Sequence, residues 1–170
     1  SYTYDDARRL ISSADALGRT TLFTYDERDR VIKITYNDDS TELFIYGQGV
    51  DANLMSKFKD RNGNVTLHEY DDLGREIRKT VAFSVMNSDG SSEIANPDSL
   101  TSVCVKTYLN GTSLMSSRVQ DGELTEYIYD YRHRLVETRS FPNAGTLLTS
   151  RKTYINNLLF STEDAYGRKT

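Results

Sequence analysis

Paired carboxylates are the first feature of this sequence that could do chemistry. Adjacent aspartates occur as Asp5-Asp6, Asp38-Asp39 and Asp71-Asp72. General acid–base catalysis needs two carboxyl groups at one cleft, with their pKa values held apart. Here each pair stands in a polar, turn-like stretch and recurs along the chain. We therefore assign the pairs to turn formation and not to catalysis.

Imidazole and thiol groups are scarce. The chain has two histidines, His68 and His133, and one cysteine, Cys104. This set lacks the ligand spacing of a zinc site, and the cysteine has no local signature of a catalytic nucleophile. Asp71, Asp130, His68 and Cys104 are the best catalytic candidates that the chain offers. We expect none of them to be catalytic, and we expect no enzymatic activity and no cofactor.

The stretch 87–93 is rich in oxygen ligands, with Asn87, Asp89 and Glu93 around Gly90. A calcium loop of the twelve-residue type places its ligands at fixed positions that this stretch does not reproduce. We therefore expect a polar loop here and no metal site.

A repeat dominates the sequence. Tyr-Asp recurs at Tyr4-Asp5, Tyr25-Asp26, Tyr70-Asp71 and Tyr129-Asp130, and the first step is 21 residues. Another 21 residues lead from Tyr25 to Tyr46, which lacks the Asp, and Tyr108 stands 21 residues before Tyr129. Longer steps, including the one to Tyr154, are interpreted as the same unit with insertions. A fixed period near 20 residues predicts one structural unit that is copied and stacked.

Each unit begins with the pattern of a β-strand. The tyrosine follows a residue that is aromatic in most copies and stands two positions earlier, as in Phe23-Thr24-Tyr25, which places both rings on one face of a strand. We expect extended segments at 22–25, 43–46, 67–70 and 126–129, with their tyrosines on one side and largely buried or lining a wall. Six residues after the Asp comes an aliphatic residue that we expect to be buried; these residues are Ile11, Ile32, Ile77 and Val136.

Turns separate the strands of each unit. An arginine stands four residues after the Asp, close enough to face it across a tight turn. A glycine often stands seven residues before the next tyrosine, where a turn needs a positive φ. We expect turns at 15–19, 26–30, 60–64 and 71–75. The first turn of three copies has Arg8, Asp29 or His133 where Gly74 stands in another, so we expect a different turn type there.

The positions that define the repeat are predicted to be structural. They are Tyr4, Asp5, Arg9, Gly18, Tyr25, Asp26, Arg30, Tyr46, Gly63, Tyr70, Asp71, Gly74, Arg75, Tyr108, Gly122, Tyr129, Asp130, Arg134, Tyr154, Gly167 and Arg168.

These residues resemble a known family. The run from Tyr70 to Ile77, YDDLGREI, is similar to the YD repeat of RHS (rearrangement hotspot) proteins, and the run from Asp15 to Asp26 is similar to the link between two such repeats. The resemblance extends over the chain in about seven copies. It implies an all-β fold: a curled antiparallel meander of about fourteen strands that forms a segment of a hollow β-shell.

The resemblance also implies a function. In bacterial polymorphic toxins and insecticidal toxin complexes, such a shell encloses a C-terminal toxin or effector. The expected partners are the remaining YD repeats of the parent chain and the enclosed effector polypeptide, and the parent would be a secreted or cell-surface bacterial protein. The alternative is a surface recognition or adhesion module like that of teneurin-type receptors, which binds a protein or glycan partner.

The composition of the chain limits the classes of binding partner that we expect. The chain has 170 residues, with 21 basic and 25 acidic side chains of interspersed sign and a net charge of −4. Nucleic-acid binding would favour a clustered basic patch, so we expect none. No stretch approaches the ~18 apolar residues of a membrane span, so we expect no membrane contact by this segment.

The repeat array occupies residues 1–170 and carries three expected insertions, near 47–54, 81–103 and 140–149. In the second of these, Val81, Phe83 and Val85 alternate, which predicts an extended strand that leads into a loop. The chain begins at the start of a unit and ends just before another is due, so we expect it to be part of a longer array.

Overall fold

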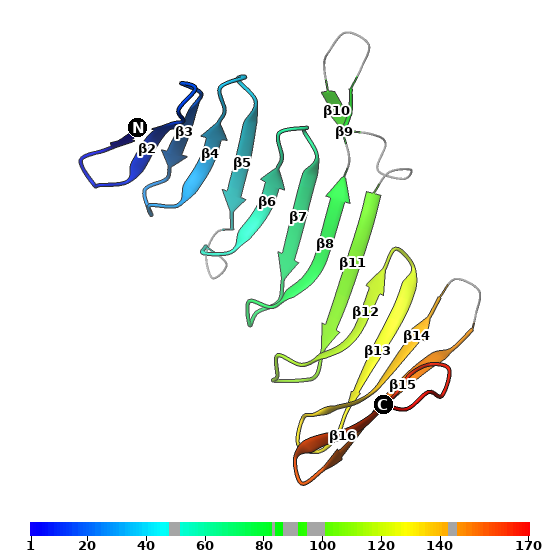
Figure 1. Cartoon of the computed structure of the whole chain (residues 1–170). Helices are drawn as coiled ribbons and strands as arrows, with labels where there is room; N and C mark the ends of the chain where they lie inside the picture. Colours follow the sequence, from blue (N-terminus) through cyan, green and yellow to red (C-terminus); the bar gives the residue numbers. More distant parts are fainter. Residues whose placement is uncertain (48–51, 83, 87–91, 95–100, 143–145) are drawn as a thin grey trace. The chain divides into compact units, whose positions relative to one another are not determined.

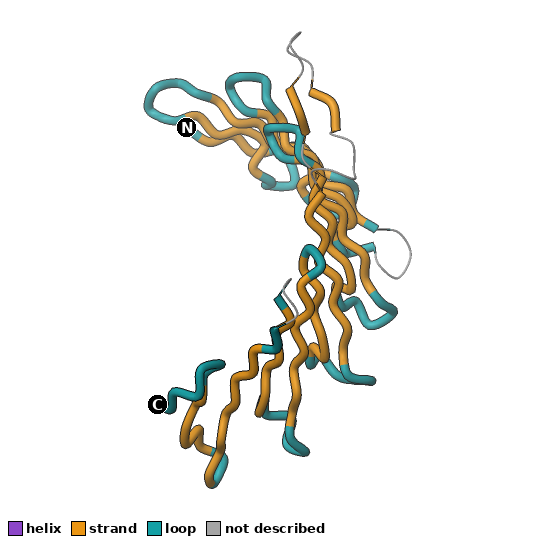
Figure 2. Tube along the Cα trace, turned by 90° about the vertical axis from the view of Figure 1, so that its right-hand side faces the viewer, coloured by secondary structure: helices purple, strands orange, loops and turns teal. Residues whose placement is uncertain are grey.

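The computed structural model describes residues 1–47, 52–82, 84–86, 92–94, 101–142 and 146–170. These residues form β-strands joined by turns, and they contain no helix that could cross a membrane (Figure 2). The oxygen-rich stretch 87–93 and the third insertion lie partly outside the described residues, as does Phe83.

The chain divides into two compact units. The first comprises Ser1–Gly74 and Thr80–Thr101, and the second comprises Arg75–Lys79 and Ser102–Thr170. The strands of the first unit are β1 (Tyr2–Tyr4), β2 (Leu10–Ala14), β3 (Thr20–Tyr25), β4 (Val31–Thr35), β5 (Thr41–Tyr46), β6 (Met55–Lys59), β7 (Val65–Tyr70), β9 (Ser84–Met86) and β10 (Ser92–Ile94).

Strand β8 (Glu76–Ala82) has its first four residues in the second unit and its last three in the first. The remaining strands of the second unit are β11 (Thr101–Tyr108), which begins one residue before it, β12 (Met115–Gln120), β13 (Glu123–Tyr129), β14 (Leu135–Phe141), β15 (Leu148–Ile155) and β16 (Leu158–Glu163).

Strand order follows the sequence. Among the described residues, fourteen strands form one sheet in the order β1 to β8 and then β11 to β16, while β9 and β10 pair in a separate two-stranded sheet (Figure 1). The all-β antiparallel meander of about fourteen strands is thus confirmed. The predicted segments 22–25, 43–46, 67–70 and 126–129 lie within β3, β5, β7 and β13. Strand β8 ends at Ala82 and β9 belongs to the smaller sheet, so 81–85 is not one continuous strand.

The register separates two faces in the first unit. Phe23 lies opposite Ile34, and Phe44 lies opposite Phe58, with the two phenylalanine rings 5.1 Å apart. Residues that face each other across antiparallel strands share a face, and so do residues two apart along a strand. Tyr25, two residues after Phe23, therefore shares the face of its aromatic neighbour, as predicted.

Burial is lower than the sequence predicts. Among the described hydrophobic side chains, only Ala52, Val65 and Cys104 are buried, at 8%, 5% and 7% exposed. The aliphatic positions Ile11, Ile32, Ile77 and Val136 are half-buried, as are Tyr25, Tyr46, Tyr70 and Tyr129. The expectation that these aliphatic residues are buried is wrong. Neighbours on the same face of a sheet cover part of a side chain, and full burial needs a second packed layer.

Candidate functional site

Among the described residues, the connection that recurs most often is a five-residue loop that begins with Asp. In the loop 26–30, the N–H of Asp26 donates to the carbonyl of Arg30 over 2.9 Å, and the N–H of Asp29 donates back to the carbonyl of Asp26 over 3.2 Å. This is a reverse turn followed by one left-handed residue, a common three-residue hairpin connection. The same pair of backbone bonds occurs in the loops 5–9, 15–19, 60–64, 130–134 and 164–168.

The fourth residue of these loops, and of the loop 71–75, has a positive φ whether or not it is glycine. The angle is 78° at Gly18, 73° at Gly74 and 77° at Gly167, and it is 64° at Arg8, 60° at Asp29 and 61° at His133. The expectation of a different turn type in the copies without glycine is therefore wrong. A left-handed conformation costs a non-glycine residue about 1–2 kcal/mol, which the hydrogen bonds of the loop offset.

Gly122 belongs to another kind of turn. It follows Asp121 in a two-residue hairpin loop between β12 and β13. The φ angle is 52° at Asp121 and 88° at Gly122. Asn156 and Asn157 adopt φ values of 48° and 69° at the corresponding place between β15 and β16. Two positive φ angles in a two-residue loop favour Gly, Asn and Asp.

The side chain of the first Asp accepts hydrogen bonds from within the five-residue loop. In loop 26–30, Oδ1 of Asp26 accepts the N–H groups of Arg28 and Arg30, at 2.9 and 3.0 Å. Its Oδ2 accepts Nε of Arg30 at 2.8 Å. The side-chain bond from arginine recurs at 2.6–2.7 Å in the pairs Asp5/Arg9, Asp15/Arg19, Asp130/Arg134 and Asp164/Arg168.

These hydrogen bonds hold the carboxylates ionised. The side-chain hydrogen bond from Arg30, followed by backbone N–H groups, lowers the pKa of Asp26 to about 2. A hydrogen bond from the arginine of the loop likewise lowers the pKa of Asp5, Asp15, Asp130 and Asp164. A carboxylate whose oxygens already accept several donors is a poor general base. The arrangement is therefore suited to structure and not to proton transfer.

The arginines of the loops that directly follow a repeat tyrosine also contact the next repeat. The guanidinium carbon of Arg30 lies 4.1 Å from the ring centroid of Tyr46, and its Nη1 donates to the carbonyl of Ala52. The guanidinium–ring distance is 5.0 Å for Arg9 and Tyr25, 4.7 Å for Arg75 and Tyr108, and 4.6 Å for Arg134 and Tyr154. A cation over an aromatic face contributes ~0.5–1 kcal/mol at an exposed site and more where water is excluded.

The hydroxyl group of the same tyrosine donates a hydrogen bond to the backbone of the preceding strand. In Tyr46 it donates to the carbonyl of Val31 over 3.0 Å, fifteen residues earlier and at the start of the preceding strand. Five other tyrosines make the equivalent bond at 2.8–3.1 Å, from Tyr25 to Leu10, Tyr70 to Met55, Tyr108 to Glu76, Tyr129 to Met115 and Tyr154 to Leu135.

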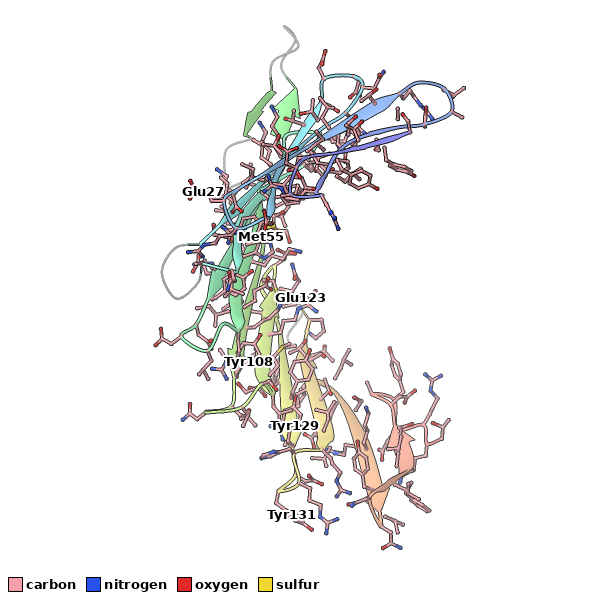
Figure 3. All side chains as sticks on the ribbon, turned by 90° about the vertical axis from the view of Figure 1, so that its left-hand side faces the viewer. Glu27, Met55, Tyr108, Glu123, Tyr129 and Tyr131 are labelled. Atoms are coloured by element: carbon pink, nitrogen blue, oxygen red, sulfur yellow. The ribbon has the colours of Figure 1, made fainter. Side chains whose placement is uncertain are left out.

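Together these contacts form a chain of interactions that we call the tyrosine–arginine ladder: Asp holds Arg, Arg covers the next Tyr, and that Tyr binds the backbone beside the Arg. Within the second unit, Figure 3 labels Tyr108 and Tyr129, which lie on strands one repeat apart, and Tyr131 at the tip of the following turn. Tyr131 is 84% exposed and takes no part in the ladder.

Sequence reasoning predicted the Asp–Arg contact but missed the two contacts between repeats. The signal was present in the spacing, because an arginine stands sixteen residues before the next tyrosine at Arg9/Tyr25 and Arg30/Tyr46. Sequence reasoning also missed that two kinds of connection share one turn. The loops 15–19 and 60–64, which join one repeat strand pair to the next, have the same Asp-headed turn as 5–9 and 26–30.

The catalytic candidates are dispersed. His68 is half-buried on β7, with its ring stacked 6.3 Å from that of Tyr70, whereas Cys104 is buried on β11 opposite Gln120. His133 is exposed in the loop 130–134. Within the described part of the chain, no group of three or more His, Cys, Asp or Glu residues could hold a metal ion.

One polar cavity lies at the loop edge of the first unit. It has a volume of about 390 Å³, and its lining includes Asp15, Arg19, Tyr36, Asp38 and Arg61. Arg61 stacks 4.0 Å from the ring centroid of Tyr36 and pairs with Asp38 at 2.8 Å. The charged groups of the cavity thus bind one another, as they do in the ladder.

The comparisons with known proteins agree with this architecture. The model of the family "RHS Repeat" matches residues 4–41. No curated protein matches the chain in sequence. The family match confirms the resemblance to the RHS/YD-repeat family over residues 4–41.

Solved toxin-complex structures share the fold. The crystal structure of TcdB2-TccC3 without its hypervariable C-terminal region superposes with a TM-score of 0.75 and 14% identity, over 99% of this chain and 9% of that one. The Tc holotoxin pore of Photorhabdus luminescens gives a TM-score of 0.65 and 16% identity, over 95% and 9%. The TcdB2-TccC3-Cdc42 structure gives 0.63 and 14%, over 95% and 10%. This chain therefore spans about a tenth of the length of these structures.

Proposed function

We propose that this chain is a shell segment of an RHS-type protein that encloses a C-terminal toxin or effector. The repeat match and the fold support a structural role. The observation that carries the proposal is the tyrosine–arginine ladder, because it binds the recurring Tyr, Asp and Arg side chains to the backbone and to one another. Such residues build a wall and are not available to a substrate.

The physical role of such a wall is isolation. Continuous strand pairing satisfies the backbone N–H and C=O groups and leaves no edge between repeats for another chain to join. A polypeptide enclosed by the wall is kept away from proteases. The proposal extends to the parent protein as a secreted or cell-surface bacterial protein, with no catalytic residue in this segment.

The test uses the full-length parent chain and follows proteolysis of its C-terminal part. We expect the C-terminal part to be protected in the wild type. The double substitution Tyr25→Ala and Tyr46→Ala should expose it, while the exposed-site control Tyr131→Ala should leave the protection unchanged. A C-terminal part that is digested equally fast in the wild type and the double variant would contradict enclosure, and binding of a surface partner by such a chain would favour the adhesion alternative.

A further inference from the structure

Two dipeptides of the chain have the composition for a modification that needs only water. Asn-Gly occurs at Asn62-Gly63 and at Asn110-Gly111. In this dipeptide the backbone nitrogen of the glycine can attack the side-chain carbonyl carbon of the asparagine, because glycine has no Cβ to hinder the approach. The two dipeptides are identical, so their surroundings in the structure decide which of them can react.

The backbone of the first dipeptide is held by hydrogen bonds. Asn62-Gly63 lies in the loop 60–64, where the N–H of Gly63 donates to the carbonyl of Asp60 over 3.0 Å. The N–H of Asn62 donates to Oδ1 of Asp60 over 2.9 Å, and Gly63 is buried. Attack by the nitrogen of Gly63 requires that its proton leave. A backbone proton in a buried hydrogen bond reaches solvent only after the loop opens.

The second dipeptide lies in an open turn. Asn110 and Gly111 are the central residues of a β-turn in the connection between β11 and β12 (Figure 1). The N–H of Thr112 closes this turn by donating to the carbonyl of Leu109 over 3.1 Å. Asn110 and Gly111 are both exposed, and a Cβ built on Gly111 would meet nothing within 4 Å. Within the described part of the chain, neither the N–H of Gly111 nor the side chain of Asn110 makes a hydrogen bond.

We propose that Asn110 deamidates spontaneously in the folded protein and that the loop 60–64 protects Asn62 from the same reaction. The nitrogen of Gly111 loses its proton to solvent and forms a bond with Cγ of Asn110. The bond from Cγ to Nδ2 breaks, and ammonia leaves with a proton from water. The product is a five-membered succinimide ring.

Water then opens the succinimide ring in one of two ways. Cleavage of the bond from the ring nitrogen to Cγ gives aspartate at position 110. Cleavage of the bond from the ring nitrogen to the main-chain carbonyl carbon gives isoaspartate, whose backbone runs through Cβ and Cγ. Either product adds one negative charge to the turn, and isoaspartate also adds one methylene group to the backbone.

The isoaspartate product alters a contact of the tyrosine–arginine ladder. The same turn presents the carbonyl of Thr112, which accepts a hydrogen bond from Nη1 of Arg75. The guanidinium carbon of Arg75 in turn lies 4.7 Å from the ring centroid of Tyr108. A longer backbone two residues before Thr112 displaces its carbonyl from Arg75. The modification therefore weakens the wall at one repeat, an effect that holds whether or not the parent encloses an effector.

The experiment compares the two dipeptides within one chain. The folded 170-residue chain is incubated at mildly alkaline pH, and samples are digested in mild acid, where the reaction is slow. Mass spectrometry follows the replacement of an amino group by a hydroxyl group at each site. We expect conversion of Asn110 to be about tenfold faster than that of Asn62, since the loop 60–64 must first open. In urea that unfolds the chain, the two rates should agree within about threefold, because the loop is then lost.

Matched variants test the site and its consequence. Asn110→Gln should stop the conversion there and leave the rate at Asn62 unchanged, because attack on the longer side chain needs a less favourable, six-membered ring. The isoaspartate form is separated by its extra negative charge and identified with a methyltransferase specific for isoaspartate. Its urea midpoint should lie about 0.5 M below that of Asn110→Asp, the shift expected for the loss of one hydrogen bond. Asn110→Asp is the control, since it carries the same charge without the extra methylene group.

Each part of the proposal has an outcome that would overturn it. Equal rates at Asn110 and Asn62 in the folded chain would show that the loop 60–64 gives no protection. A rate difference that persists in urea would assign the selectivity to neighbouring residues in the sequence and not to the turns. Conversion of Asn110 only in the unfolded chain would show that the turn holds the dipeptide away from the reactive geometry. An isoaspartate form with the midpoint of Asn110→Asp would remove the effect on the ladder.

Discussion

Removing one hydroxyl group from the tyrosine–arginine ladder should measurably destabilise the protein. In Tyr46→Phe the ring stays under the guanidinium of Arg30, 4.1 Å from its carbon, but the 3.0 Å hydrogen bond to the carbonyl of Val31 is lost. A net intramolecular hydrogen bond contributes ~0.5–1.5 kcal/mol. We expect a loss of about 1 kcal/mol, because the bond is partly buried and the carbonyl can regain water only in part.

Removing Arg30 should cost more than removing the hydroxyl. Arg30→Ala deletes the contact with the Tyr46 ring, the ion pair with Asp26 and the bond to the carbonyl of Ala52. Cation–π contacts and exposed ion pairs contribute ~0.5–1 kcal/mol each, so the sum is about 2 kcal/mol. Because Arg30 and Tyr46 touch, the double variant should deviate from additivity by ~0.5 kcal/mol or more.

Urea unfolding followed by circular dichroism measures these differences. With an m-value of ~2 kcal/mol/M, a loss of about 1 kcal/mol lowers the midpoint by about 0.5 M. The control is Tyr166→Phe, since Tyr166 is 79% exposed and its hydroxyl makes no hydrogen bond within the described part of the chain. If Tyr46→Phe and Tyr166→Phe both unfold at the wild-type midpoint, the ladder does not stabilise the repeat and the reasoning is refuted.

Three further predictions concern the wall and its turns. Tyr70→Ala should cost about 2–3 kcal/mol by urea midpoint, the low end of large-to-small changes, because the ring is half-buried; an unchanged midpoint would favour a role in ligand binding. Gly18→Ala should cost about 1 kcal/mol through its φ of 78° alone, since an added Cβ meets nothing within 4 Å, whereas His133→Gly should be neutral or stabilising; opposite signs would contradict this account. The hydrogen bond from Arg30 lowers the pKa of Asp26 to about 2 from 3.8, so the advantage of wild type over Asp26→Asn should be full above pH ~4 and vanish as the pH falls towards 2; an advantage independent of pH would contradict the assignment.

The sequence by itself determined the repeat and its strands. Alternation around Tyr25 specifies a strand because side chains on a strand point to opposite faces in turn. The Asp–Arg spacing in 26–30 specifies a tight hairpin, because the backbone bonds of that turn are local. Both features depend on residues close in sequence, so local geometry was enough to predict them.

Only the tertiary structure decided what the tyrosine and arginine contact beyond their own turn. The bond from Tyr46 to Val31 joins two strands, and the stacking of Arg30 on Tyr46 joins the loop 26–30 to β5. The geometry of both depends on the register and on the bulge that shifts it between Ile45 and Tyr46. The half-burial of Ile32 likewise depends on surroundings that no local pattern contains. A periodic sequence specifies the unit, whereas the coverage of each side chain depends on the elements that pack against it.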